Sequence, residues 1–567
     1  SQFGGLVNYR TKAADTTRRI AFESISSAGS YGLLGTWNSA SGRVGPLTYR
    51  AYASGRQSDG YRSSSESRAS SQYLGVDYRV NDKVDVRGQV GRSWYRYQIP
   101  GALTDAMFDA NPRAATRSRN WFSPDIVVPS VAVTWRPNWR TRVHAQLSAV
   151  LGNRSSVQFV GFADVRDTVQ AATGTYLPRQ VDIDGFQSIT GEVRVTNEYR
   201  LGDLPWILAA GIAINDNDLH RRQQGRGTTG TGYDLTLSSG TFGRDIHYLT
   251  NNVAVYAEQL IPVTSRFSVI PGVRIERGET RMRGRLSYLD PAQVPTNIEH
   301  NYPLFGIRAE WQVANAEVYG GWSQSYRPMI LKDVIPETAI ERTDPNLRDA
   351  RGWTIEGGVR GMLGHVRYDV SAFALRYNNR FGGILQVDSA GASYLFKTNV
   401  GSSLTRGIEL ALDAPLVVMR TGALRAHTAT SYFDGTYRRG TVTSAGQNLD
   451  ITGNRIEAVP KWISRTGLTA GGSATSATLL VSYTSDSYAD PQNTLVPSAN
   501  GARGLVPSYT IVDVNASRQL APWVRVRVGV SNLFGANYFT KRPTFYPGPG
   551  IWPSDGRGVN ASVELVR

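Results

Sequence analysis

Arginine is the residue type in this sequence that is best suited to binding chemistry. The formal net charge is +16 at pH 7, and almost all of the 62 basic residues are arginines. A guanidinium group presents a planar fork of donors that matches carboxylates and phosphates. Several arginines fall in long polar segments that we expect to be loops, where they could converge on an anionic ligand together with the aromatic residues Tyr326 and Trp121: Arg113, Arg117, Arg119, Arg221, Arg222, Arg226, Arg327, Arg438 and Arg439.

Other kinds of site chemistry find little support in the sequence. There is no cysteine, so disulfides and thiolate metal sites are excluded. The six histidines are scattered without the spacing of a zinc site. No nucleophile-elbow or phosphate-loop motif is present. The sequence therefore predicts a protein that is not an enzyme and that has no cofactor and no metal site.

The elements that must position the arginines have a period of two residues. Val524, Val526 and Val528 alternate with Arg525 and Arg527, which describes a strand with one apolar face and one polar face. The same alternation returns in residues 84–90, 142–149, 353–360 and 408–413. Charges at so many positions of one face do not suit the packed core of a soluble sandwich, whereas they suit the lumen of a membrane barrel. No apolar run approaches the roughly 18 residues that a spanning helix needs.

The connections between the predicted strands alternate between short and long. Short turns are expected at residues 80–83, 136–140, 201–205, 261–266, 313–316, 362–366, 471–475 and 519–523. Between them lie long polar segments at 98–130, 161–183, 221–246, 281–299, 327–350, 380–402, 438–458, 490–507 and 533–557. Short periplasmic turns and long extracellular loops are typical of bacterial outer-membrane barrels. We predict an all-β chain that folds as an antiparallel up-and-down transmembrane barrel of about 22 strands.

Particular motifs carry a family resemblance. Residues 530–538 (VSNLFGANY), with 546–550 (YPGPG) and a final alternating strand, resemble the C-terminal region of TonB-dependent outer-membrane receptors. Residues 398–401 (TNVG) with 405–410 (TRGIEL), and 326–328 (YRP) with 344–347 (DPNL), look like two further strand motifs of that family. Within the family, residues 325–328, 333–336 and 100–105 look most like the ferric-citrate receptor group. The absence of histidine between Arg327 and Leu347 argues against a haem receptor.

The resemblance also has two departures. Residues 3–9 (FGGLVNY) look like the last strand of the family's plug domain, but the rest of the plug and its TonB-contacting segment are absent from this sequence. We therefore divide the chain into the end of a plug with a connector at 1–18 and the barrel at 19–567. The chain ends in Val566 and Arg567, where the family usually has an aromatic residue.

The resemblance implies a function at the outer membrane of a Gram-negative-type bacterium. The chain would be the multi-pass barrel of a receptor that takes up a ferric chelate, such as ferric citrate or another siderophore, and that meets TonB only through a plug. Its surroundings would be outer-membrane lipid, lipopolysaccharide and accessory outer-membrane proteins. An alternative is a plugless structural barrel whose lumen is closed by another polypeptide. A third hypothesis is that the protein is a soluble all-β multidomain adhesin.

The candidate residues have plainer interpretations as well. The loop arginines could be solvated or could contact lipopolysaccharide phosphates, and the aromatic residues could form girdles at the lipid interface. Nucleic acid is not expected as a partner, because the arginines are spread through the chain and not gathered in one patch. Charged pairs such as Arg406 with Glu409, or Arg360 with Glu356, are expected to be ion pairs of the lumen.

Overall fold

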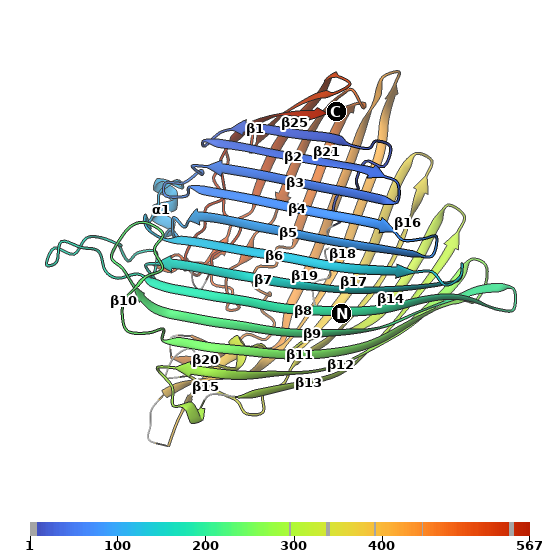
Figure 1. Ribbon diagram of the computed structural model, residues 1–567. Helices are drawn as coiled ribbons and strands as arrows, with labels where there is room; N and C mark the ends of the chain where they lie inside the picture. The colour runs from blue at the N-terminus through green and yellow to red at the C-terminus, as the bar shows by residue number, and fades with distance from the viewer. Residues whose placement is uncertain are drawn as a thin grey trace.

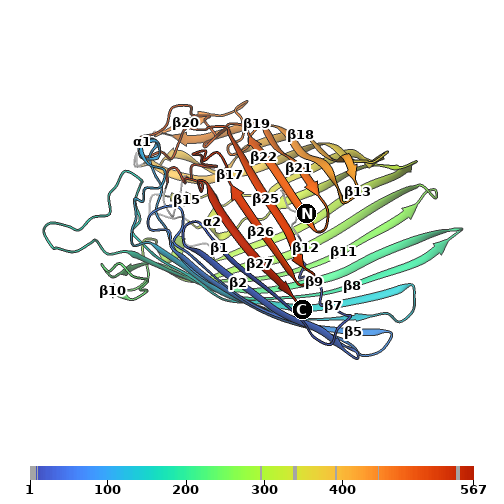
Figure 2. The ribbon, with the colours of Figure 1, turned by 90° about the horizontal axis from the view of Figure 1, so that it is seen from above.

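The computed structural model describes residues 8, 10–293, 296–335, 341–389, 393–444, 446–543 and 549–567. Within these residues, twenty-two long antiparallel strands form one closed barrel. The barrel closes where the first strand, β1 (Ala21–Gly29), pairs with the last, β27 (Gly558–Val566). Figure 1 shows strands β1 to β13 crossing in front of the strands that follow them in the chain, and Figure 2 shows the wall from above. The predicted fold class and strand number are confirmed.

The other barrel strands are β2 (Leu33–Val44), β3 (Leu47–Ser58), β4 (Ser67–Arg79), β5 (Val84–Gln98), β6 (Trp121–Trp135), β7 (Thr141–Gln158), β8 (Gln180–Leu201), β9 (Leu204–Gly227), β11 (Arg244–Pro262), β12 (Phe267–Leu286), β13 (Asn297–Val313), β14 (Ala316–Arg327), β16 (Ala350–Leu363), β17 (Val366–Val387), β18 (Ser393–Met419), β19 (Gly422–Ser444), β21 (Trp462–Gly471), β22 (Thr475–Thr484), β25 (Tyr509–Ala521) and β26 (Val524–Ser531). Short strands extend or flank this wall: β10 (Leu237–Ser239), β15 (Glu341–Thr343) and β20 (Gln447–Asp450), with the separate pair β23 (Ser487–Tyr488) and β24 (Leu505–Val506). The helical elements are α1 (Asp105–Ala110), α2 (Leu331–Val334) and the 3-10 helix η1 (Pro291–Gln293).

The alternation of the sequence sets the two faces of the wall. On β26, Val528 is exposed on the outer face, while its neighbour Arg527 forms an ion pair with Glu564 of β27 at 2.5 Å. Large apolar side chains are exposed in the same way around the ring, as a lipid-facing band requires. The polar residues meet across strands on the inner face.

Both expected lumenal pairs need correction. Arg360 pairs with Glu317, which lies directly opposite on β14, at 2.6 Å, and not with Glu356. Directly opposite residues of an antiparallel pair are about 5 Å apart, whereas residues four apart on one strand are separated by roughly 13 Å. Arg406 and Glu409 are three residues apart on β18, so their side chains point to opposite faces.

The short turns lie at one end of the barrel, as predicted, but several strands continue farther into the long segments than expected. β9 extends to Gly227, β19 extends to Ser444, and β17 and β18 pair as far as Val387 with Ser393. Five of the candidate arginines therefore lie on strands and not in loops: Arg221, Arg222, Arg226, Arg438 and Arg439. Beyond the lipid-facing band both faces of a strand can be polar, so the two-residue pattern that defines a strand fades there.

The long segments pack on one another through small cores at the loop end. Ile246, Tyr248 and Met282 on the inner face of β11 and β12 form one core with Val334 and Ile335 from the α2 segment. This core fills part of the barrel mouth above β11 to β13. The loop end is therefore a set of ordered, folded segments.

A second core lies at the loop end, near the seam where β1 pairs with β27. It joins Leu103, Val506, Phe539 and Ile551. Its residues come from three different long segments.

The N-terminal segment lies against the inner wall at the turn end. Lys12 donates to the Glu23 carboxylate at 2.5 Å, and the Arg50 guanidinium donates to the carbonyl of Ala13 at 2.7 Å. The plug-like motif at residues 3–9 falls almost wholly outside the described residues. No helix among the described residues is long and apolar enough to span a membrane.

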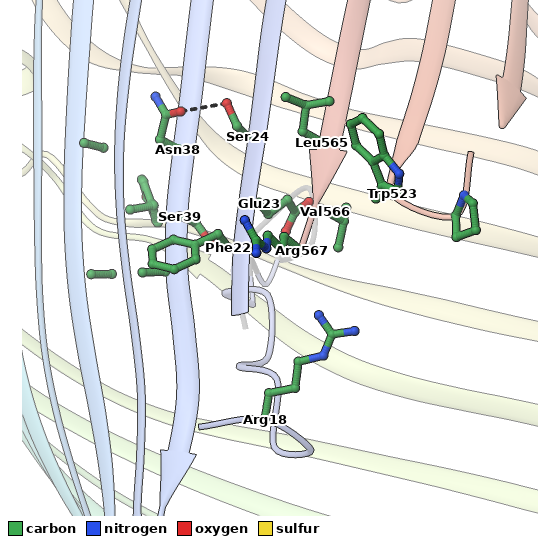
Figure 3. A pocket seen from close by; sticks show the side chains of 15 residues that line it. Arg18, Phe22, Glu23, Ser24, Asn38, Ser39, Trp523, Leu565, Val566 and Arg567 are labelled. Carbon is green, nitrogen blue, oxygen red and sulfur yellow. Dashed lines mark hydrogen bonds between the residues drawn. The ribbon is translucent and has the colours of Figure 1, made fainter. Parts of the chain in front are cut away.

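A hollow of about 1060 Å³ lies at the turn end of the seam, between β1, β2, β3 and β27. Figure 3 shows Phe22, Trp523 and Leu565 among the side chains that line it, with a dashed bond between Ser24 and Asn38. In that bond the Ser24 hydroxyl donates to the Asn38 side-chain oxygen at 2.7 Å. Phe22, Trp523 and Leu565 are exposed and belong to the outer, lipid-facing band. Hydrocarbon is the expected filling, so this hollow is not the candidate ligand site.

Candidate functional site

The first inward-facing arginine cluster is built where β7, β8 and β9 rise above the lipid-facing band. Arg154 of β7 and Arg221 of β9 both bind the carboxylate of Asp184 on β8, at 2.5 Å and 3.0 Å. The three positions lie opposite one another in the strand ladder. The Asp184 side chain is almost fully buried, whereas both arginine side chains stay partly exposed.

A second inward-facing cluster lies farther round the wall, on β14 and β17. Arg327 binds Asp333 at 3.0 Å and lies 4.5 Å from the ring centre of Phe381. Arg380 binds Glu457 at 3.2 Å. Arg380 also lies over the rings of Tyr377 and Tyr437, at 5.1 and 5.0 Å.

These two clusters share an arrangement that can bind an anion. A guanidinium group has five N–H donors, and one carboxylate occupies only some of them. The carboxylate fixes the side chain in place, so an anion that binds the remaining donors meets a guanidinium group that is already ordered. In the second cluster, aromatic faces add an apolar surface beside the charge.

The three arginines of the 99–120 loop are committed to holding that loop together. Arg119 is 0% exposed and forms a bidentate pair with Asp167 at 2.7 Å. Arg117 is buried and donates to the backbone carbonyls of Val165, Gly161 and Phe162, and this burial lowers the pKa of its guanidinium. Arg113 donates to the carbonyl of Tyr61 at 2.9 Å.

Of the five candidate arginines on β9 and β19, only Arg221 joins an inward-facing cluster. Arg222 is the next residue and therefore points to the opposite face from Arg221. Arg226 is exposed near the end of β9. Arg438 and Arg439 are exposed at a β-bulge of β19.

The two aromatic candidates, Tyr326 and Trp121, both form hydrogen bonds within the protein. The Tyr326 hydroxyl donates to the carboxylate of Glu276, and its ring centre lies 4.0 Å from that of Tyr302. The Trp121 indole donates to the carbonyl of Thr231 at 2.8 Å.

One carboxyl group near the first cluster carries a shifted pKa. Burial raises the pKa of Asp182, although hydrogen bonds from the backbone N–H of Gln224 and the side chain of Gln180 partly oppose the shift. Gln224 adopts a left-handed backbone conformation, with φ of 60°. It lies where the pairing of β8 with β9 is irregular, and the bond to Asp182 stabilises this backbone. This carboxyl group therefore orders the backbone at the rim of the mouth.

The described part of the chain holds no group of three or more His, Asp or Glu side chains arranged to bind a metal ion directly. Any metal recognised by these arginines would have to arrive inside an anionic complex, because guanidinium groups bind anions and are not metal ligands.

Comparison with known families identifies the barrel. The model of the "TonB dependent receptor-like, beta-barrel" family matches residues 145–533, well over half of the chain. The chain belongs to the TonB-dependent receptor β-barrel family. As a member of this family, the receptor barrel is a protein of the Gram-negative outer membrane.

Solved structures share the fold of this receptor barrel at low sequence identity. The ferric citrate transporter FecA has a TM-score of 0.81 at 17% identity, over 100% of this chain and 81% of that one. The siderophore receptor PiuA from Acinetobacter baumannii has a TM-score of 0.77 at 15% identity, over 98% and 82% of the two chains. The copper transporter OprC has a TM-score of 0.74 at 14% identity, over 99% and 82%. The fold alone therefore does not select the ligand.

Arg154, Asp184 and Arg380 were not among the candidates proposed from the sequence. Arg154 and Asp184 could have been found by continuing the inner-face positions of β7 and β8 past the apolar band. Arg380 could not have been found this way, because the strand pairing is irregular between Tyr377 and Phe381.

Proposed function

We propose that this receptor barrel takes up an anionic ferric chelate, with ferric citrate as the first candidate. The observation that carries the proposal is the pair of inward-facing arginine clusters at the barrel mouth, Arg154 with Arg221 and Arg327 with Arg380. Guanidinium groups fixed by carboxylates favour a ligand that presents several carboxylate oxygens. The protein would be a binding and transport protein and not an enzyme.

The proposed ligand site is narrower than the set of arginines predicted from the sequence. It keeps Arg221 and Arg327, adds Arg154 and Arg380, and leaves out arginines that hold loops or lie on the outer face. Tyr326 and Trp121 would support the rim through their hydrogen bonds to Glu276 and Thr231.

We also propose that residues 1–18 end a plug domain and that residues 19–567 form the barrel. Lys12 and Arg50 hold this segment at the turn end of the lumen, which is where a plug would connect to the wall. Energy from TonB would reach the ligand site through the plug and not through the barrel wall.

Uptake of radioactive iron tests the function. Cells that lack the gene, and cells that carry it again with its natural N-terminal sequence, are supplied with ferric citrate, with and without active TonB. The proposal predicts iron uptake that needs both the gene and TonB. Uptake that needs the gene but not TonB would instead indicate a plugless barrel, and uptake that needs neither would reject the transport role.

A further inference from the structure

Three arginines gather on the outside of the barrel, away from the lumen. Ile408 of β18 is 55% exposed and marks the lipid-facing side of that strand. It lies opposite Ala372 of β17, and four positions farther along each strand Leu404 lies opposite Arg376. This ladder is regular between the two pairs, so alternation places Arg376 on the outer face.

A β-bulge adds two more arginines to the same face. Ser403 pairs with Tyr437, and the next residue, Ser402, pairs with Arg439, so Arg438 is the extra residue of β19. Ser402 lies on the outer side of β18, as Ile408 does, and Arg439 opposite it shares that side. Both arginines of a two-against-one bulge can then point outward together.

The three arginines line a hollow of about 470 Å³ that has no acidic residue in its wall. The Arg376 guanidinium is held in place by bonds to the Asn378 side chain at 2.9 Å and to the Ser402 hydroxyl at 3.1 Å. Arg438 and Arg439 are exposed, and no ion pair joins either of them to a carboxylate of the described residues. This differs from the inward-facing clusters, in which each arginine has an acidic partner.

The level of the hollow relative to the membrane follows from the aromatic residues below it. Tyr432 pairs in register with both Ile408 and Trp462, and the Tyr432 and Trp462 rings are 4.8 Å apart. Trp462 is 46% exposed, and exposed tryptophan on the outer face marks the interface of the lipid with water. At about 3.3 Å per residue and a tilt of about 40°, the arginines lie roughly 10 to 18 Å beyond Tyr432, on the external side of the lipid-facing band.

We propose that Arg376, Arg438 and Arg439 bind a phosphate group on the headgroup of an outer-leaflet glycolipid. Phosphate monoesters match the guanidinium fork, and three unneutralised arginines close together are stabilised by such an anion. The lipid would fix the β18 and β19 wall at the membrane surface. This site is independent of the proposed uptake function, because it lies on the other side of the wall.

Native mass spectrometry of the purified protein in detergent tests the site, with lipid A carrying two phosphates as the probe. We expect one tightly bound lipid on the unmodified protein, at least tenfold weaker binding to the Arg438→Gln/Arg439→Gln variant, and equally weak binding of lipid A whose phosphates have been removed. Arg367→Gln, which changes a lumen-facing arginine on β17, is the matched control and should bind as the unmodified protein does. The Arg438→Lys/Arg439→Lys variant keeps the charge and should retain more lipid than the glutamine variant.

Inorganic phosphate separates the lipid from a free anion. Displacement of lipid A only at phosphate concentrations far above those of the lipid supports a headgroup site. Displacement at equal concentrations would overturn the assignment to lipid. Equal binding of phosphorylated and dephosphorylated lipid, or equal binding to the glutamine variant and the unmodified protein, would overturn the site itself. Heat-dependent gel mobility checks that each variant forms the barrel.

Discussion

At the scale of single residues, the direction of a side chain on its strand decides what an arginine can do. Arg221 and Arg222 are neighbours in the sequence, yet one shares Asp184 with Arg154 in the mouth and the other lies on the opposite face. The same residue type therefore serves the lumen, the loops and the outer surface of one barrel.

This pair offers a matched test of the ligand site. A charge-assisted hydrogen bond contributes about 1.5–3 kcal/mol, which corresponds to roughly 10- to 100-fold in affinity. We expect Arg221→Ala to weaken ferric citrate binding by about that factor and Arg222→Ala to leave it nearly unchanged. Equilibrium dialysis with radioactive iron measures both, and equal losses in the two variants would argue against the proposed site.

The buried pair of Arg119 and Asp167 holds two loops together. Removing one partner leaves an uncompensated buried charge, which costs about 3–5 kcal/mol. We expect Arg119→Met to speed cleavage by thermolysin within residues 159–179 at least tenfold. The exposed neighbour Arg166→Met is the control.

A double variant separates the lost charge from the lost packing. Arg119→Met with Asp167→Leu leaves no buried charge and should restore much of the resistance to thermolysin. If the double variant is cleaved as fast as Arg119→Met, the ion pair is not what orders the loops.

At the scale of elements, the strands could be predicted because lipid imposes alternation on them. Where an apolar face must meet hydrocarbon, as on β26, the period of two residues is strict and the strand is readily recognised. Above the lipid the constraint ends, so the upper parts of β9 and β19 resembled loops. The partners Asp184 and Glu457 could not be assigned to their arginines either, because cross-strand and loop contacts depend on register and loop packing, which one sequence does not reveal.

The loops over the seam depend on one arginine. Arg542 is 5% exposed, binds Asp105 at the start of α1 at 2.6 Å, and donates to the carbonyls of Leu505 and Gly501. We expect Arg542→Met to increase hydrogen exchange of the α1 amides at least tenfold, because the helix loses its anchor and a helix of six residues is not stable alone.

The adjacent exposed residue provides the control for this measurement. Lys541→Met should leave exchange in α1 unchanged. Unchanged exchange in the Arg542→Met variant would mean that the apolar contact of Phe108 with Phe539, whose ring centres are 5.2 Å apart, holds the helix by itself.

At the scale of the whole molecule, lipid surrounds a polar interior, and two neighbouring residues of β7 test this arrangement. Leu147 is 52% exposed on the outer face, whereas Gln146 lies opposite Glu192 on the inner face. An arginine at the lipid-facing midplane costs about 2–4 kcal/mol. Leu147→Arg should therefore lower the free energy of unfolding in lipid vesicles by that amount.

The inner position should accept the same charge. Gln146→Arg should change the free energy of unfolding by less than about 1 kcal/mol, because the new guanidinium can meet Glu192 across the strands. Similar losses from both substitutions would contradict the assignment of the two faces.

We propose that the arginine-bearing mouth of this barrel selects an anionic ferric chelate. The most direct test of this selectivity is to measure equilibrium binding of a series of ferric chelates that differ in net charge. The purified protein is used at low and at physiological salt. We expect ferric citrate to bind more tightly than neutral or cationic chelates and its affinity to fall as salt increases. Preference for a neutral or cationic chelate, or binding of ferric citrate that salt does not weaken, would contradict it.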